Sequence, residues 1–245
     1  MKNIVIAAGY ATRLGELTKN FPKPLLKIGN STILGRIMDD IDGIDDITEH
    51  IIVTNHKFAH IFEEWKASTK YNKPVTIIDD GTETNETRLG AVKDLLLAIE
   101  TQQVDDDIMV LAADNILDFS FKGFVEFFKE KNSSIIMCYH EPELKRLQRT
   151  GVIEVTEDMK VLQMQEKPEV PVSNWAVPPF YIYKRSDLPL IKDCMAHGCG
   201  FDAPGNLAHY LVDVTSIYAW QMPGNRFDIG SLDTYYEAIE KYGKN

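Results

Sequence analysis

The sequence predicts an α/β fold with a Rossmann-like, mixed but mostly parallel central sheet and helices on both of its faces. Two observations predict this class. In the first half, short apolar runs of strand type alternate with amphipathic stretches of helical period. Such alternation is typical of parallel strands joined by crossover helices. From about residue 151 the apolar runs follow one another more closely, which predicts a β-rich portion in the second half.

The period of each segment predicts the individual elements. We expect strands at residues 3–8, 51–53, 75–78, 108–111, 152–155, 161–164, 176–183 and 217–221. We expect helices at residues 33–41, 58–65, 89–99, 188–195, 205–211 and 231–242. Apolar runs closely bracket the prolines of residues 168–179, so we expect no flexible linker and a single domain over residues 1–245.

The charge and the cysteine content argue against several classes of protein. A net charge of −11 disfavours a nucleic-acid partner, because affinity for a polyanion comes mainly from clustered basic residues. Three cysteines do not describe a disulfide framework, and Cys194, His197 and Cys199 lack a fourth zinc ligand. We interpret the cysteines as ordinary thiols. With no membrane span and no signal peptide in the pattern, we expect a cytoplasmic protein without a membrane partner.

The loop after the first expected strand is suited to an anion. It reads Ala7-Ala-Gly-Tyr-Ala-Thr-Arg-Leu-Gly15, and the N–H groups of such loops attract phosphates. Residues 1–27 also carry five basic side chains against one acidic side chain. Glycine in such a turn has a purely steric explanation as well. The loop matches neither the P-loop pattern nor G-x-G-x-x-G, which removes the main support for kinases and dehydrogenases.

Two aspartates follow strand-like segments. Asp114 comes at the end of a buried run, where an isolated carboxylate is costly unless it meets a partner or a cation. Asp228 follows the last strand-like region, and Mg²⁺ is typically held by one or two carboxylates together with substrate phosphates. Each aspartate has an equally good explanation as a turn or helix-cap residue.

The combination of Arg13 with Phe21-Pro-Lys-Pro-Leu-Leu26 resembles the sugar-phosphate nucleotidyltransferase family. That family includes glucose-1-phosphate thymidylyltransferase and related NDP-sugar pyrophosphorylases, and its hallmark is A-A-G-x-G-T-R-L followed by P-K-P-L-L. The resemblance implies that Arg13 holds the β- and γ-phosphates and that Lys23 contacts the phosphates near the reacting centre. It implies that three residues lie against the nucleotide, Ala8, Gly9 and Thr12. Ala11 replaces the usual glycine, which we expect to narrow or re-aim the loop.

The resemblance also pairs the two aspartates. In the family a G-D-N-like motif and a late D-x-G motif both reach the metal, which makes Asp114 and Asp228 the ligands of a Mg²⁺ cofactor. Ala113 replaces the customary glycine of the first motif, which is a departure from the family where its backbone approaches the metal.

Residues 165–168 and 172–177 resemble the E-K-P and S-N-x-A-V segments that form the sugar side of the family's site. By resemblance, Glu166 accepts hydrogen bonds from sugar hydroxyls, Lys167 fixes the phosphate of the sugar 1-phosphate, and Gly151 lets the backbone approach the sugar. Two further candidates are Val177 and Asp202. Without the family, Glu166 and Lys167 form an ordinary surface charge pair, and Asp202 belongs to a turn before a helix. Relatives commonly carry Thr-Gly at the position of Pro178-Pro179, so this chain departs from the family pattern on the sugar side.

Residues 79–90 occupy the stretch where family members read the nucleobase. Asn85 and Arg88 would supply hydrogen bonds to a base edge, and Gly90 would let the base lie against the main chain. The alternative explanation of Thr84–Thr87 as a helix start, with polar side chains capping exposed N–H groups, is equally good.

The resemblance implies a Mg²⁺-dependent reaction of a nucleoside triphosphate with a sugar 1-phosphate that yields an NDP-sugar and pyrophosphate. We expect residues 1–120 to bind mainly the nucleotide and residues 121–245 mainly the sugar phosphate. Two rival functions remain: a cytidylyltransferase acting on another phosphorylated molecule such as phosphocholine, and a non-catalytic relative that senses nucleotide sugars. A homodimer is the commonest assembly of soluble enzymes.

Overall fold

The structure is a computed structural model that describes residues 1–244 and divides into two compact units. Each unit combines segments that lie far apart in the sequence. Unit 1 comprises Met1, residues 90–111 and residues 123–223, and unit 2 comprises residues 2–89, residues 112–122 and the chain from Gly224 onward.

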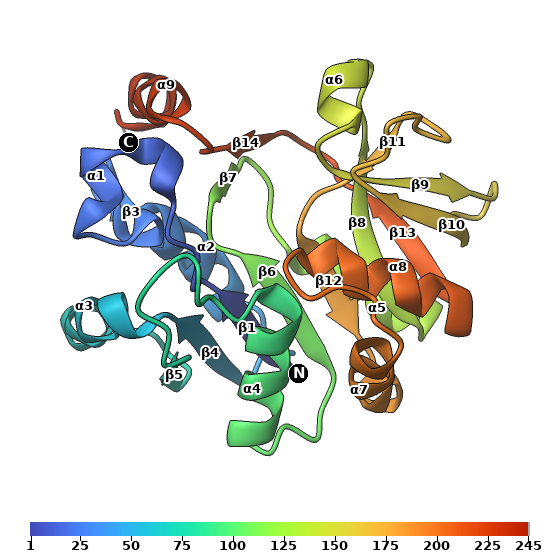
Figure 1. Ribbon diagram of the computed structural model, residues 1–245, viewed down its shortest axis with the longest axis horizontal. Coiled ribbons are helices and arrows are strands. Elements are labelled where there is room, and N and C mark those ends of the chain that lie inside the picture. Colours follow the sequence, from blue (N-terminus) through green and yellow to red (C-terminus); the bar gives the residue numbers. More distant parts are fainter. Residues whose placement is uncertain (245) are drawn as a thin grey trace. The chain divides into compact units, whose positions relative to one another are not determined.

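A parallel sheet of three strands lies in unit 2 (Figure 1). Strands β1 (Lys2–Ile6) and β5 (Val75–Asp79) both pair with β4 (Glu49–Thr54). The interior of the sheet is apolar because every residue from Ile51 to Val53 is fully buried. Two helices connect these strands, α2 (Ile33–Asp42) and α3 (His56–Ser68).

Side-chain caps fix where the two connecting helices begin. The Thr32 hydroxyl accepts a hydrogen bond from the backbone N–H of Gly35 (2.9 Å), and the Asn55 side chain accepts one from Phe58 (3.1 Å). Both residues have extended backbone and satisfy an N–H group that has no partner within its helix.

A second part of unit 2 surrounds an apolar cluster. A short antiparallel ribbon pairs β7 (Asn115–Leu117) with β14 (Arg226–Asp228), and helix α9 (Leu232–Tyr242) follows. Figure 1 shows α9, at the carboxyl end, near α1 (Glu16–Lys19). The remaining elements of this part are η1 (Thr12–Leu14), α1 (Glu16–Lys19), η2 (Lys23–Leu25), β2 (Lys27–Ile28) and β3 (Ser31–Thr32). The cluster that joins these segments consists of Leu14, Leu26, Ile28, Ile33, Ile116, Ile229, Tyr235 and Ala238, and is called the loop cluster below.

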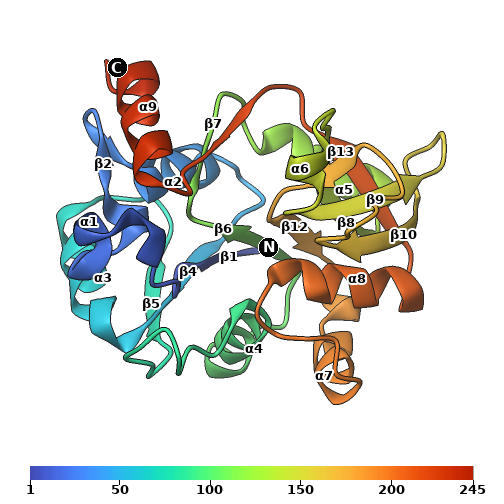
Figure 2. The same ribbon diagram turned by 45° about the horizontal axis from the view of Figure 1, so that its top comes forward.

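The sheet of unit 1 is mixed (Figure 2). Its strands run in the order β10 (Val161–Glu166), β9 (Gly151–Val155), β11 (Trp175–Val177), β8 (Ser134–His140), β12 (Phe180–Tyr183) and β6 (Ile108–Ala112). Those pairings are antiparallel, and β13 (Ile217–Gln221) pairs with β8 in parallel. The helical elements of this unit are α4 (Ala91–Thr101), α5 (Lys122–Lys131, whose first residue belongs to unit 2), α6 (Leu144–Leu147), η3 (Arg185–Asp187), α7 (Pro189–Ala196) and α8 (Pro204–Val214).

Pro178 and Pro179 interrupt one continuous strand. Both β11 and β12 run antiparallel to β8, and the register advances by two residues across the prolines: Ala176 lies opposite Tyr139, whereas Tyr181 lies opposite Ile136. Proline has no N–H to donate to a ladder, so it is confined to bulges and edges. Before the break the strand pairs with β9, and after it the strand pairs with β6.

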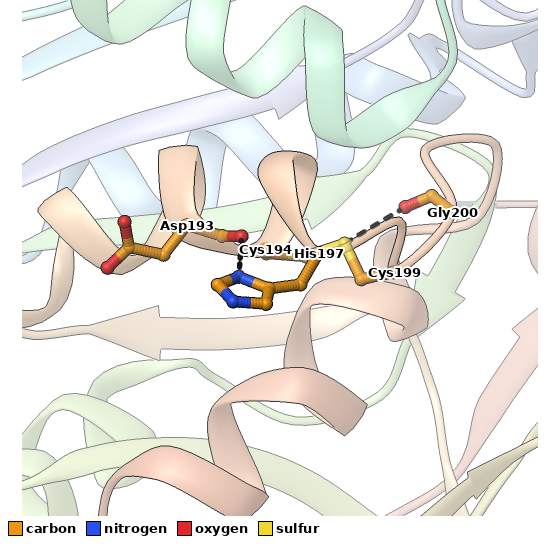
Figure 3. The surroundings of a disulfide bond; sticks show 5 residues. All are labelled: Asp193, Cys194, His197, Cys199 and Gly200. Carbon is orange, nitrogen blue, oxygen red and sulfur yellow. Dashed lines mark hydrogen bonds between the residues drawn. A yellow bond between two sulfur atoms is a disulfide. The ribbon is translucent and has the colours of Figure 1, made fainter.

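The expectation of three ordinary thiols is wrong. Cys138 is a buried free thiol, but Cys194 and Cys199 form a disulfide with Cα atoms 5.3 Å apart (Figure 3). Gly198, with φ +70°, ends helix α7 in the left-handed conformation, and the chain folds back so that the Cys199 N–H reaches the Cys194 carbonyl (3.1 Å). The sequence spacing alone did not reveal this turn. His197 takes no part in the bond, since its Nδ1 lies 2.8 Å from the Asp193 carbonyl.

The predicted α/β class is confirmed, and the expected elements are present with small shifts of their ends. The strand at 217–221 has the expected bounds, and the segment 176–183 is split by its prolines. Elements between residues 115 and 147 were missed, along with β14 and the short helices near the amino terminus. Within residues 1–244, none of the helices has the length and apolar character that crossing a membrane requires.

A buried polar network ties β1, α2 and β4 together. His50 is fully buried; its Nδ1 lies 3.0 Å from the Asn3 amide nitrogen, and its Nε2 lies 3.2 Å from Oδ1 of Asp42. Backbone N–H groups of Asn72 and Lys73 also donate to the Asp42 carboxylate (2.8 and 3.1 Å). Burial lowers the pKa of His50, and although the bond to Asp42 opposes the shift, burial dominates.

This network makes stability depend on pH. The pKa of His50 is lower in the folded chain than in the unfolded chain, so protonation of His50 favours unfolding. The free energy of unfolding is therefore unaffected by His50 above its ordinary pKa of about 6.5, and it decreases as pH falls from that value towards the lowered pKa of the folded chain. For one proton the slope is at most about 1.4 kcal/mol per pH unit. We predict that His50→Gln removes this part of the slope in urea unfolding measured between about pH 7.5 and 5.5.

His56 provides a control of opposite sign. Its hydrogen bond to Asp79 (2.6 Å) raises its pKa, so its contribution is present at low pH and is lost as pH rises. His56→Gln should therefore steepen the loss of stability on acidification. Parallel pH profiles for wild type and His50→Gln would contradict the assignment.

Candidate active site

The amino-terminal loop of unit 2 holds a strained backbone. Ala11 has φ 48° and ψ 38°, in the left-handed region, and Gly15 has φ 57°. The loop is anchored at Leu14, which is 1% exposed in the loop cluster, and the flanking Thr12 and Arg13 are exposed. Ala11 thus adopts the conformation that glycine prefers, and the loop keeps this backbone at a cost of about 1–2 kcal/mol.

The start of the loop is held by one buried side chain. Asn55, which is fully buried, donates from its Nδ2 to the Ala8 carbonyl (2.9 Å) while its Oδ1 caps α3. Gly9 is exposed, and a Cβ built there would meet nothing within 4 Å. An approaching ligand would find open main chain at Gly9.

Lys23 contacts both of the segments that carry the predicted metal ligands, Asp114 and Asp228. Pro22 and Pro24 flank it, and the fixed φ of proline restricts this short 3₁₀ helix. Its Nζ donates to Oδ2 of Asp114 (2.9 Å) and to the Ile229 carbonyl (3.0 Å), although these partners lie 91 and 206 residues away. Only 13% of the Lys23 side chain is exposed.

The β7–β14 ribbon places the two aspartates close to each other. Asp228 lies directly opposite Asn115, the residue after Asp114. Burial alone would raise the pKa of Asp114, but the charges of Lys23 and Arg226 outweigh it and lower that pKa. At Asp228, loss of hydration and the negative charge of Asp114 raise the pKa, and the neighbouring cations offset this only in part. The two pKa values shift in opposite directions because the two carboxylates compete for the same neighbouring cations.

Arg13 belongs to the same group of charges. A Cβ added to Gly230 would lie 3.3 Å from Oδ2 of Asp228 and 4.0 Å from Nη1 of Arg13, so both side chains flank this glycine. The guanidinium of Arg13 also contributes to lowering the pKa of Asp228 against the dominant effect of burial. Unit 2 therefore brings together Arg13, Lys23, Asp114 and Asp228.

The oxygen atoms around the Lys23 ammonium fit a hard divalent cation. They are a carboxylate oxygen and a main-chain carbonyl oxygen, the ligand types that Mg²⁺ accepts. Across residues 1–244 there is no group of three or more His, Cys, Asp or Glu side chains arranged to hold a metal. Two carboxylates are nevertheless sufficient for Mg²⁺ when substrate phosphates complete its coordination.

In unit 1 the predicted sugar-side residues lie side by side. Gly151 on β9 is opposite Glu166 on β10 and opposite Val177 on β11. The next residue, Lys167, donates its N–H to the Thr150 carbonyl (3.1 Å), and the Thr150 hydroxyl donates to the Val177 carbonyl (2.8 Å). Strand register therefore assembles these residues although 26 positions separate Gly151 from Val177.

Two glycines make room for the Glu166 carboxylate. A Cβ at Gly205, in the first turn of α8, would lie 2.0 Å from Oε2 of Glu166, and one at Gly151 would lie 3.3 Å from the same atom. Burial raises the pKa of Glu166, and the charge of Lys167, whose Nζ is 3.7 Å from Oε1, opposes this. An open hollow of about 580 Å³ adjoins the carboxylate and is lined by Gln165, Glu166, Pro168, Glu169, Val170, Asn206 and His209.

Lys167 has a strained backbone as well. Its φ of 49° is left-handed, a conformation that costs a residue with a side chain about 1–2 kcal/mol. Five non-glycine residues within 1–244 have positive φ, and two of them, Ala11 and Lys167, lie at predicted site positions. Strain of this kind is typical of functional sites.

The predicted nucleobase segment is a loop and not the start of a helix. The Thr87 N–H donates to the Thr84 carbonyl (3.1 Å) in a local turn, and α4 begins only at Ala91. Arg88 donates to the Asn85 carbonyl (2.7 Å) in the same turn of unit 2. Thr84–Thr87 therefore does not cap the helix.

Gly90 and Asp202 are connected within unit 1. Gly90 has φ 91°, and a Cβ there would lie 2.5 Å from the Phe201 carbonyl oxygen, so packing alone requires glycine. The N–H of Ala91 donates to the Asp202 carbonyl (3.3 Å), and the Asp202 side chain is exposed. The main chain before α8 thus satisfies the first N–H groups of α4.

Comparison with known proteins identifies the family. The sequence profile described as nucleotidyl transferase matches residues 2–245. The chain belongs to the nucleotidyl transferase family. The resemblance found in the motifs is thereby confirmed.

Relatives of the family differ in length. A glucose-1-phosphate adenylyltransferase of Clostridium novyi is 26% identical over 97% of this chain, which spans only 65% of that protein. A UTP–glucose-1-phosphate uridylyltransferase of Haloferax volcanii is 23% identical, with 98% of this chain and 96% of that protein covered. A solved UDP-glucose pyrophosphorylase complexed with UDP-glucose has the same fold, with a TM-score of 0.81, 22% identity, and coverage of 99% and 98%.

Sequence reasoning missed three residues that the structure places in the candidate site. Asn115 is fully buried and donates to Oδ1 of Asp114 (2.7 Å), and Arg226 donates to Asn115 (2.6 Å). Gly205 accommodates Glu166. A glycine inside a predicted helix is a usable signal, because it usually has a packing or functional reason. The sequence contained no comparable signal for Arg226, because a positive charge close to the predicted metal ligand Asp228 would repel a metal ion.

We predict that Ala11→Gly stabilises unit 2 slightly. Relief of about 1–2 kcal/mol of strain is partly offset by about 0.4–1 kcal/mol of added entropy in the unfolded chain. The net gain, up to about 1.5 kcal/mol, is measurable by urea unfolding. Gln103→Gly, at an exposed position with φ 49° outside the site, is the matched control and should behave alike. A clear loss of stability in Ala11→Gly alone would show that Ala11 is not strained.

Proposed function

We propose that this chain joins the α-phosphate of a nucleoside triphosphate to a sugar 1-phosphate, giving an NDP-sugar and pyrophosphate. The observation that carries the proposal is the cluster of Arg13, Lys23, Asp114 and Asp228 in unit 2. Two cationic side chains and two carboxylates in one place suit a polyphosphate accompanied by a divalent cation. Membership in the nucleotidyl transferase family supports the same reaction.

The nucleophile of this reaction needs no strong base. A sugar 1-phosphate is largely dianionic at neutral pH because its second pKa is about 6. Its oxygen forms a bond to the α-phosphorus as the bond to the pyrophosphate oxygen breaks, and the electron pair leaves with pyrophosphate. Catalysis then consists of positioning and charge neutralisation. Arg13 binds the β- and γ-phosphates and Lys23 the phosphates near the reacting centre, with Ala8, Gly9 and Thr12 against the nucleotide.

Asp114 and Asp228 would hold Mg²⁺ in this proposal. The bound cation would neutralise the charge that crowds around the α-phosphate. Lys23, whose ammonium contacts Asp114 in the ligand-free protein, is then drawn to the phosphates, since a polyphosphate offers it more negative charge than one carboxylate.

The acceptor binds in unit 1 in this proposal. Glu166 accepts hydrogen bonds from sugar hydroxyls beside Gly151 and Val177, and Lys167 holds the phosphate. The exposed Lys167 ammonium and the strained backbone that presents it support this role. Asp202 is a further candidate for the sugar.

Asn85, Arg88 and Gly90 are proposed to contact the base. Gly90 is the weakest candidate of the three because its packing against Phe201 already requires glycine. The reaction is expected in the cytoplasm, where nucleoside triphosphates are abundant.

A screen of each nucleoside triphosphate against sugar 1-phosphates, phosphocholine and polyol phosphates tests the proposal through pyrophosphate release. Turnover only with a sugar 1-phosphate is the expected result. Turnover only with another phosphorylated acceptor, or binding without product, would reject it.

We predict that Asp114→Ala, Lys23→Met and Lys167→Ala each lower steady-state turnover by a factor of about 10² or more. Lys23 and Lys167 supply positive charge that stabilises the transferring phosphate, and Asp114 would hold the cation that does the same. Lys70→Ala, at an exposed lysine outside the site, is the matched control and should retain full activity. Near-normal pyrophosphate release from the three variants would refute their roles.

Gly205→Ala should separate function from stability. The new Cβ would displace the flexible end of Glu166, while alanine favours the helix by about 1 kcal/mol. We expect KM for the sugar 1-phosphate to rise about tenfold or more, the melting temperature to hold or increase, and KM for the triphosphate to stay the same. An unchanged acceptor KM would argue that Glu166 does not bind the sugar.

A further inference from the structure

A chain of two hydrogen bonds leads from Arg226 to Asp114. Nη1 of Arg226 donates to Oδ1 of Asn115 at 2.6 Å, and Nδ2 of Asn115 donates to Oδ1 of Asp114 at 2.7 Å. Asn115 is fully buried, so its amide is shielded from bulk water. The other carboxylate oxygen of Asp114 accepts from Lys23.

The chemistry of Arg226 fixes which way the Asn115 amide faces. A guanidinium only donates hydrogen bonds, so the amide oxygen must face Arg226. The amide NH₂ must then face Asp114, where it can donate to the carboxylate. Without Arg226 the two ends of the amide would no longer be distinguished by this partner, and a reversed amide would place its oxygen against the Asp114 carboxylate.

The ribbon that carries these residues is held at its far end. Asn225 donates from its backbone N–H to Oδ1 of Asp118 (2.7 Å) and from its side chain to Oδ2 (2.9 Å). Within the ribbon Arg226 lies opposite Leu117 and Asp228 lies opposite Asn115. This pair of short strands thus carries Asn115, Arg226 and Asp228, and Asp114 directly precedes its first strand.

We propose that Arg226 and Asn115 are positioning residues that hold the Asp114 carboxylate in the orientation required by a divalent cation. The inference rests on the proposed function only for the presence of a cation site. In this proposal Arg226 acts on the Asp114 carboxylate through the Asn115 amide. The pair preorganises Asp114 before any ligand binds, which is what a site built on rigid elements with supporting hydrogen bonds requires.

Arg226 also affects a cation in the opposite sense. Its positive charge acts on both Asp114 and Asp228, so removing it reduces repulsion and favours cation binding. A single substitution therefore mixes the loss of orientation with the loss of repulsion. A double-mutant cycle separates the two effects because the charge effect is common to both backgrounds.

The test is the affinity for Mn²⁺ alone, measured by electron paramagnetic resonance on the full chain. The four proteins are wild type, Arg226→Met, Asn115→Ala and the double variant. We compare the factor by which Arg226→Met changes the Mn²⁺ affinity in each background. This factor should favour binding by about fivefold or more in the Asn115→Ala background relative to its value in the wild-type background. In that background no orientation remains to be lost. Lys27→Met, at an exposed cation of unit 2, should have the same effect in both backgrounds.

The outcomes are distinct. An equal effect of Arg226→Met in both backgrounds would overturn the inference and leave the proposed cation site intact. Wild-type protein that shows no saturable Mn²⁺ binding sensitive to Asp114→Ala would overturn the cation site itself and this inference with it. If Asn115→Ala fails to fold, by its thermal melt, Asn115→Ser replaces it in the cycle with the same expected result.

Discussion

The ion pair between Lys23 and Asp114 is the interaction on which the candidate site of unit 2 depends. It joins residues 91 positions apart, and the second bond of Lys23, to the Ile229 carbonyl, brings in the segment that carries Asp228. Removing both groups from much of the surrounding water is costly, and such a pair is weak evidence for stability. We therefore interpret the pair as preorganisation of the site. The Lys23 ammonium holds the Asp114 carboxylate and the Ile229 carbonyl oxygen at the place where a cation and phosphates are expected to bind.

Apolar packing below this pair keeps its parts in place. The loop cluster includes Leu14 next to Arg13, Ile116 close to Asp114, and Ile229 next to Asp228. Each charged residue is therefore one or two positions from a buried anchor. The backbone strain at Ala11 is tolerated because the surrounding packing outweighs about 1–2 kcal/mol. In unit 1 strand register does the same work for Gly151, Glu166 and Val177.

The sequence predicted the elements with strong periodicity, since strands β1, β4 and β13 and helices α2 and α9 bury regular apolar patterns. It could not predict β7 and β14, because three-residue strands carry no measurable period. The resemblance supplied Arg13, Lys23, Asp114 and Asp228, but it gave no account of Arg226 or Asn115, whose roles depend on a pairing across 111 residues. The Cys194–Cys199 bond was missed because it depends on a left-handed turn at Gly198.

The most direct test of the central claim is a crystal structure of the chain with pyrophosphate and Mn²⁺, using anomalous scattering to locate the metal. The account predicts a Mn²⁺ peak in contact with Asp114 and Asp228, pyrophosphate against Arg13, and the Lys23 ammonium moved from Asp114 to a phosphate oxygen. Mn²⁺ bound elsewhere, with the Lys23–Asp114 pair unchanged beside bound pyrophosphate, would contradict it.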